Sequence, residues 1–137
     1  MKKILFLHGF YASGQCIPAM ALRDAFEGRA EVITPDLPIH PKEAVRFISE
    51  LIEAEKPDLL IGNSCGSFYA QMLAPVVGLP ALLGNPHFKM TEFLKHYDTT
   101  YHFPGAHTPT AEEVHTWYMP LAEKMLMDYP LPEDGIR

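Results

Sequence analysis

The chain is organised around one stretch, Leu59-Leu60-Ile61-Gly62-Asn63-Ser64-Cys65-Gly66-Ser67-Phe68-Tyr69-Ala70. A short apolar run, of the kind that is buried in a parallel sheet, leads into Gly-x-Ser-x-Gly, and a helical pattern follows. Strand, Gly-x-Ser-x-Gly and helix in this order predict a nucleophile elbow, in which a serine is held on a sharp turn. The alternative interpretation is an ordinary turn whose glycines and serine only make the bend and cap the helix.

The elbow assigns a role to each of its residues. Ser64 is the predicted nucleophile, because centring the turn on Cys65 would put Asn63 and Ser67 in place of the two glycines. Glycines are needed where the helix crosses back over the strand, since a Cβ atom would collide there. The N–H of Cys65, at the start of the helix, is predicted to supply half of an oxyanion hole.

The residues after the elbow have the i, i+3, i+4, i+7 spacing of an amphipathic helix. Its predicted buried side consists of Cys65, Phe68, Tyr69, Met72, Leu73 and Val76. Pro75 and Gly78 are expected to end this helix.

Composition and net charge indicate the number of domains and exclude some kinds of binding partner. A chain of 137 residues, 47% of them hydrophobic, is expected to form a single domain, residues 1–137, with its own core. The formal net charge of -6 and the lack of a basic cluster argue against nucleic acid or an anionic membrane surface as a partner. His8-Gly9 breaks the opening apolar run, which therefore predicts a strand rather than a signal peptide. No apolar run approaches the length that spans a membrane.

The number and spacing of the cysteines and histidines indicate the cellular compartment and whether the chain could bind a metal ion. The two cysteines, Cys16 and Cys65, form no disulfide framework and predict reduced thiols in a cytoplasmic setting. No two histidines or cysteines share a ligand-like spacing on one element, so no metal site is expected. The sequence leaves the oligomeric state open.

Strand and helix patterns alternate along the chain, which predicts an α/β fold with a mostly parallel sheet and helices on both faces. Strands are expected at 3–7, 31–34, 58–61, 81–84 and 99–103. Helices are expected at 15–27, at 41–55 and after the elbow, and a capping box at 110–113 opens a last helix. Residues 129–137 are expected to form a frayed tail.

A small-residue loop follows the first predicted strand, at the edge of the sheet where open α/β folds bind ligands. The N–H of Phe10, just after His8-Gly9, is predicted to be the second oxyanion donor. Tyr11, the next residue, is assigned to the substrate pocket. The alternative is a plain loop in which His8 is hydrogen-bonded to the backbone.

A serine hydroxyl attacks an ester at neutral pH only when a base takes its proton, and histidine has a suitable pKa. His107 is the predicted base. It lies in a Gly-flanked loop between the last predicted strand and the last helix, which fits a triad whose histidine comes last in the chain. The alternative is a loop histidine that is hydrogen-bonded to the backbone.

The triad acid is not identified from the residues. Glu92 and Asp98 are the only acids between Ser64 and His107, and neither follows an apolar strand, so neither is assigned. Asp36 precedes the serine, and a role in tethering a loop is favoured for it.

Residues 86–95 follow the fourth predicted strand, on the same edge as Ser64. They are interpreted as the start of a lid, and His87 and Phe88 are assigned to the substrate pocket. A short helix that packs its own apolar side is the alternative of equal weight.

Five motifs cover nearly the whole chain in order: Phe6-Leu7-His8-Gly9-Phe10, Pro35-Asp36-Leu37-Pro38, Gly62-Asn63-Ser64-Cys65-Gly66-Ser67-Phe68-Tyr69-Ala70, Gly84-Asn85-Pro86-His87-Phe88 and Phe103-Pro104-Gly105-Ala106-His107-Thr108-Pro109. In these motifs the chain resembles the small bacterial α/β-hydrolase family of YqiA-like and YcfP-like esterases. The resemblance implies a minimal α/β-hydrolase fold with Ser64 as nucleophile and His107 as base.

The chain departs from this family at one point. Family members carry a further segment, with a lid-like stretch and a Gly-x-x-Asp-bearing strand, between the positions that match Lys95 and His96. The acid-bearing strand is therefore missing between about residues 95 and 96. Because a gap inside a sheet would leave backbone groups unpaired, we expect that an internal segment is absent from this sequence.

Two functions remain open at this point. The first is a serine hydrolase that acts on carboxylic esters, including thioesters, and needs a small-molecule ester substrate but no cofactor. The second is a non-catalytic binding or scaffold protein that keeps the elbow and lacks a complete triad.

Overall fold

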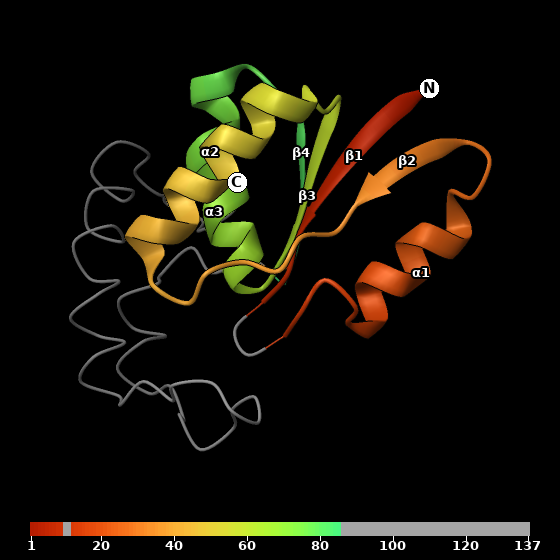
Figure 1. The fold of residues 1–137 in the computed structure, drawn as a ribbon, viewed down its shortest axis with the longest axis horizontal. Helices are drawn as coiled ribbons and strands as arrows, with labels where there is room; N and C mark the ends of the chain where they lie inside the picture. The colour runs from red at the N-terminus through yellow and green to blue at the C-terminus, as the bar shows by residue number, and fades with distance from the viewer. Residues whose placement is uncertain (10–11, 86–137) are drawn as a thin grey trace, which may run out of the picture. The chain divides into compact units, whose positions relative to one another are not determined.

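The computed structural model describes residues 1–9 and 12–85 of the chain (Figure 1). Residues Met1–Pro86 form one compact unit. The predictions for Phe10 and Tyr11, for the lid and the pocket at 86–95, for the junction near residue 95 and for everything after it lie outside the described residues.

The described elements alternate between strand and helix. They are β1 (Lys2–Leu7), α1 (Ile17–Ala25), β2 (Ala30–Ile33), α2 (Pro41–Glu55), β3 (Leu59–Asn63), α3 (Cys65–Val77) and β4 (Ala81–Gly84). Each predicted element of this region is present, and its ends agree to within two residues. None of these helices is long and apolar enough to cross a membrane.

The four described strands are parallel and lie in the order β2-β1-β3-β4. Figure 1 shows α1 on one face of this sheet and α2 and α3 on the other. The predicted fold class, a parallel sheet with helices on both faces, is confirmed for the described residues. The chain moves outward from β1 to β2 and then returns to β3 on the other side of β1. In such sheets ligands bind at this reversal, outside the carboxyl ends of the two central strands.

The central strands are buried on both faces, which explains their uninterrupted apolar sequences. Ile4 and Phe6 pack in the core under α1, together with Ala19, Val32 and Ile61. Alternate residues of a strand point to opposite faces, so Leu5 and Leu7, both fully buried, face α2 and α3.

The prediction for the end of α3 is confirmed at Gly78 but not at Pro75. The helix continues past Pro75 to Val77, and it ends at Gly78, which has φ 72° and donates its N–H to the carbonyl of Ala74. Val76 was predicted to be buried, and this prediction is wrong, because 74% of its surface is exposed. The whole last turn, 75–78, is exposed, so the buried side of the helix ends at Ala74.

Candidate active site

Ser64 lies on a sharp turn between β3 and α3. Its backbone has φ 56° and ψ -116°, a positive-φ conformation outside the αL region that residues other than glycine adopt rarely and at an energetic cost. Its carbonyl accepts the first hydrogen bond of α3, from the N–H of Ser67 at 2.9 Å. Strained residues of this kind cluster at functional sites, and the conformation is the one that a nucleophile elbow requires.

The two elbow glycines are required by close backbone contacts. A Cβ atom on Gly62 would overlap the carbonyl of Gly66 and the N–H of Ser67. A Cβ atom on Gly66 would overlap the carbonyl of Leu7, at the end of β1. The structure thus confirms that α3 crosses back over the sheet at a distance that only glycine permits.

The elbow is also fixed to the neighbouring strand β4. The N–H of Ser64 donates to the carbonyl of Gly84 at 2.8 Å. The hydroxyl of Ser67, which is fully buried, lies 2.6 Å from the same carbonyl and 2.8 Å from the carbonyl of Gly62. One hydroxyl proton is therefore shared between two strand ends. Ser67 holds together the ends of β3 and β4 beneath the nucleophile candidate, a role that its sequence position did not indicate.

The loop after β1 lies directly against Ser64. A methyl group placed on Gly9 would be 3.2 Å from Cβ of Ser64 and 3.7 Å from its Oγ. This proximity follows from the register, because Leu7 of β1 pairs with Gly62 of β3 and the two loops leave the same edge of the sheet. The next residue of the loop is Phe10, whose N–H is the predicted second oxyanion donor and lies outside the described residues.

His8 connects this loop to the loop after β2. Its Nε2 accepts the N–H of Leu37 at 2.9 Å, so the ring proton is on Nδ1, which donates to the carbonyl of Gly9 at 2.7 Å. Burial lowers the pKa of His8 below its ordinary value, although the hydrogen bond to Gly9 and the negative charge of Asp36 act in the opposite direction. His8 is thus a neutral ring with both nitrogens engaged, as the alternative interpretation of this loop predicted.

Asp36 tethers the far end of the same loop. Its Oδ1 accepts the N–H of Gly14 at 2.7 Å, which confirms the predicted tethering role. The loop from residue 8 to residue 14 is therefore anchored at both ends to the segment after β2. At the near end of the loop, the hydrogen bond from Nδ1 of His8 to the carbonyl of Gly9 helps to hold the backbone that lies beside Ser64.

The pKa of His8 leads to a prediction about stability. Because this pKa is lower in the folded chain than its ordinary value of 6.5, the unfolded chain takes up a proton here at a higher pH than the folded chain. The contribution of His8 to stability is thus complete above pH 6.5 and is lost as the pH falls toward the lowered folded pKa. Denaturant unfolding of wild type and His8→Gln at several pH values measures this difference. The amide can still accept the N–H of Leu37, and parallel curves for the two proteins would contradict the assignment.

A pair of amide side chains lies beside the elbow. Nδ2 of Asn85 donates to Oδ1 of Asn63 at 3.0 Å, and Asn85 has φ 48°. The pair joins the residue before Ser64 to the residue after β4, where the chain continues toward the predicted pocket residues. No pattern in the sequence pointed to this contact, because it depends on the pairing of β3 with β4.

Of the predicted site residues, Ser64 and Cys65 belong to the described part of the chain. Cys65 is 3% exposed and is the first residue of α3, so its N–H lies at the positive end of the helix dipole. Neither Cys16 nor Cys65 forms a disulfide bond. Within the described ranges no group of three His, Cys, Asp or Glu side chains could hold a metal ion. The predicted base His107 and the pocket residues Tyr11, His87 and Phe88 lie outside these ranges.

Comparison with known proteins places this geometry in a family. A family model described as "Uncharacterised protein family (UPF0227)" matches residues 3–119. Among solved structures, an extracellular α/β-hydrolase from a Paenibacillus species matches 59% of this chain with 18% sequence identity and a TM-score of 0.48. Its title states that it shares structural and functional homology with tobacco salicylic acid binding protein 2. The match spans 38% of the length of that hydrolase.

Proposed function

The chain belongs to UPF0227, the YqiA-like and YcfP-like family that its motifs resemble, and we propose that it is a serine hydrolase acting on carboxylic esters, including thioesters. The observation that carries this proposal is the geometry of Ser64. The residue is strained, it lies at the start of α3, and the backbone of Gly9 approaches it from the neighbouring strand. An ordinary turn at this position would not need a serine with φ 56° and ψ -116°, which lies outside the αL region that Lys56 adopts at the end of α2.

The reaction would proceed through an acyl-enzyme. His107 takes the proton of Ser64 Oγ as this oxygen forms a bond to the ester carbonyl carbon. The carbonyl oxygen becomes an oxyanion, which the N–H groups of Cys65 and Phe10 stabilise. The bond to the alcohol or thiol then breaks, and the leaving group receives the proton from His107. Water, activated by the same histidine, releases the acid and restores the serine.

The described residues support individual parts of this reaction. The N-terminal position of Cys65 in α3 favours negative charge next to Ser64. The hydrogen bonds of His8 and Asp36 hold the described residues on either side of Phe10, the proposed second donor. Tyr11, His87 and Phe88 are proposed to contact a small-molecule ester, and no cofactor is needed. The two free thiols support a cytoplasmic location.

A non-catalytic binding function is the second candidate. The observation that favours it is the absence of an assignable acid, because Glu92 and Asp98 are the only acids between Ser64 and His107. Without an acid the imidazole lacks the partner that fixes its tautomer and orientation. A chain of this kind would bind an ester or a related ligand at the elbow and release it unchanged.

Labelling with a fluorophosphonate separates the two candidates, because the probe phosphonylates only a serine that a base has activated. The full chain is treated with the probe, digested and analysed by mass spectrometry. We expect the peptide that contains Ser64 to gain the mass of the probe. His107→Ala should abolish labelling, whereas His40→Ala, which replaces the histidine that caps α2, should keep it. An unlabelled wild type, or a label at another residue, would reject the hydrolase.

A further inference from the structure

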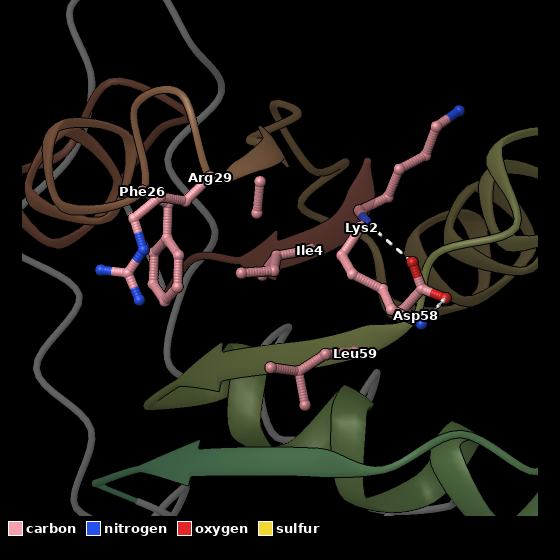
Figure 2. A pocket seen from close by; sticks show the side chains of 8 residues that line it. Lys2, Ile4, Phe26, Arg29, Asp58 and Leu59 are labelled. Atoms are coloured by element: carbon pink, nitrogen blue, oxygen red, sulfur yellow. Dashed lines mark hydrogen bonds and ion pairs between the residues drawn. The ribbon is translucent and has the colours of Figure 1, made fainter.

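A cavity of about 400 Å³ lies at the edge of the sheet opposite to Ser64, where the strands begin (Figure 2). Its volume falls within the roughly 300–1,000 Å³ of small-ligand pockets. It is lined by Lys2, Lys3, Ile4, Phe26, Arg29, Ala30, Asp58 and Leu59. Since the strands are parallel, this site and the elbow are separated by the length of the sheet, and the hydrolase assignment does not use any of these residues.

The cavity combines an apolar floor with charged ends. Figure 2 shows Ile4 and Leu59 between two groups, with Phe26 and Arg29 on one side and Lys2 and Asp58 on the other. Ile4 is 4% exposed and belongs to the core under α1, so the accessible apolar surface of the cavity comes from the partly buried Phe26, Ala30 and Leu59, which pack against this core. An apolar body placed on this floor would gain about 25 cal/mol for each Å² that it buries.

Arg29 is the cation that is available to a ligand. Its guanidinium lies 5.5 Å from the centroid of the Phe26 ring, and among the described residues it makes no ion pair. Backbone hydrogen bonds to the carbonyl of Phe26, from Arg29 at 2.8 Å and from Ala30 at 3.0 Å, hold the turn that presents it. A guanidinium stacked on a ring keeps its charge and its fork of donors, which fit a carboxylate.

The other charges of the cavity are already paired. Nζ of Lys2 is 3.7 Å from Oδ1 of Asp58, and Oδ2 of Asp58 accepts the backbone N–H of Lys3 at 2.8 Å. Nζ of Lys3 pairs with Glu55 at 3.2 Å. A cationic ligand would therefore have to displace Lys2 from Asp58, whereas an anionic one meets Arg29, which makes no ion pair with another described residue.

We propose that this cavity binds small organic carboxylates that have an apolar body. The carboxylate pairs with Arg29, and the body lies against the partly exposed side chains of Leu59, Ala30 and Phe26. A neutral apolar ligand would gain nothing from the exposed guanidinium of Arg29, and an inorganic anion would gain nothing from the apolar residues of the lining. The proposal is independent of the hydrolase assignment, because the residues that carry it are at the opposite edge of the sheet.

The test is an NMR titration of the full chain with phenylacetate, compared with its neutral isostere phenylacetamide and with acetate, which lacks the apolar body. We expect phenylacetate to shift the amide signals of 2–4, 26–30 and 58–59. The amide and acetate should each bind at least about tenfold more weakly, a difference of about 1.4 kcal/mol. Equal binding of phenylacetate and phenylacetamide, or shifts that gather around Ser64, would overturn the proposal.

Two arginine variants complete the test. Arg29→Gln should reduce phenylacetate binding to the level of phenylacetamide, with the fold retained, because Arg29 is exposed. Arg46→Gln, at an exposed position on α2, is the matched control and should bind like wild type. Unchanged binding in Arg29→Gln, or an equal loss in Arg46→Gln, would show that the cavity does not select a carboxylate.

Discussion

Ser64→Ala is expected to lower kcat for short activated esters by about 10⁶, the loss typical of removing a triad nucleophile. The reason is geometric, because the backbone conformation of Ser64 and the hydrogen bond from its N–H to the carbonyl of Gly84 fix this residue in the turn between β3 and α3. A steady-state assay with a short-chain aryl ester measures the change, and circular dichroism checks that the variant is folded.

Cys65→Ala is the matched control for this experiment, because a thiol is the other nucleophile near the turn. The substitution removes the thiol and keeps the backbone N–H that the oxyanion needs. The side chain of Cys65 is buried, so we expect kcat of the variant to stay within about tenfold of wild type. The small cavity that the missing thiol leaves should lower the stability of the fold. If Ser64→Ala retained wild-type turnover with the same pH profile, or if Cys65→Ala alone abolished it, the assignment of Ser64 would be wrong.

The described part of the fold could be predicted because its signals are local. Buried parallel strands give uninterrupted apolar runs, and α2 begins at Pro41 and ends at Glu55 as its pattern predicts. The elbow glycines are equally local, since Gly-x-Ser-x-Gly specifies the turn in five residues. Val76 shows the limit of such patterns. The spacing of apolar residues predicts which side of a helix faces the core, but it does not predict how far along the helix the core extends.

The supporting contacts of the site could not be predicted from the sequence. The partner of His8 is Leu37, and the hydroxyl of Ser67 reaches Gly84, both of which are distant in the chain. These contacts depend on strand order and register, which bring three loops to one edge of the sheet. Asp36 was predictable as a tether because it precedes the serine, but its partner Gly14 was not.

The second large effect is expected for Gly66→Ala, which should lower the free energy of unfolding by about 3 kcal/mol or more. Overpacking of a close contact costs about 1–3 kcal/mol when neighbours can shift. Here a Cβ atom would overlap the carbonyl of Leu7 and lie 2.9 Å from that of His8, and both are backbone atoms at the end of a central strand. Urea denaturation, with the slope compared to that of wild type, measures the loss.

The sign of this effect separates a steric cause from ordinary helix preference. Gly66 lies in the first turn of α3, where alanine would otherwise stabilise a helix by about 0.5–1 kcal/mol over glycine. The matched control is Gly78→Ala, at the other end of the same helix, where φ is 72° and a Cβ atom would meet nothing within 4 Å. Its cost should be about 1–2 kcal/mol, from the left-handed conformation alone. If Gly66→Ala were as stable as wild type, or more stable than Gly78→Ala, α3 would not cross β1 as closely as the structure shows, and the elbow would lose its physical basis.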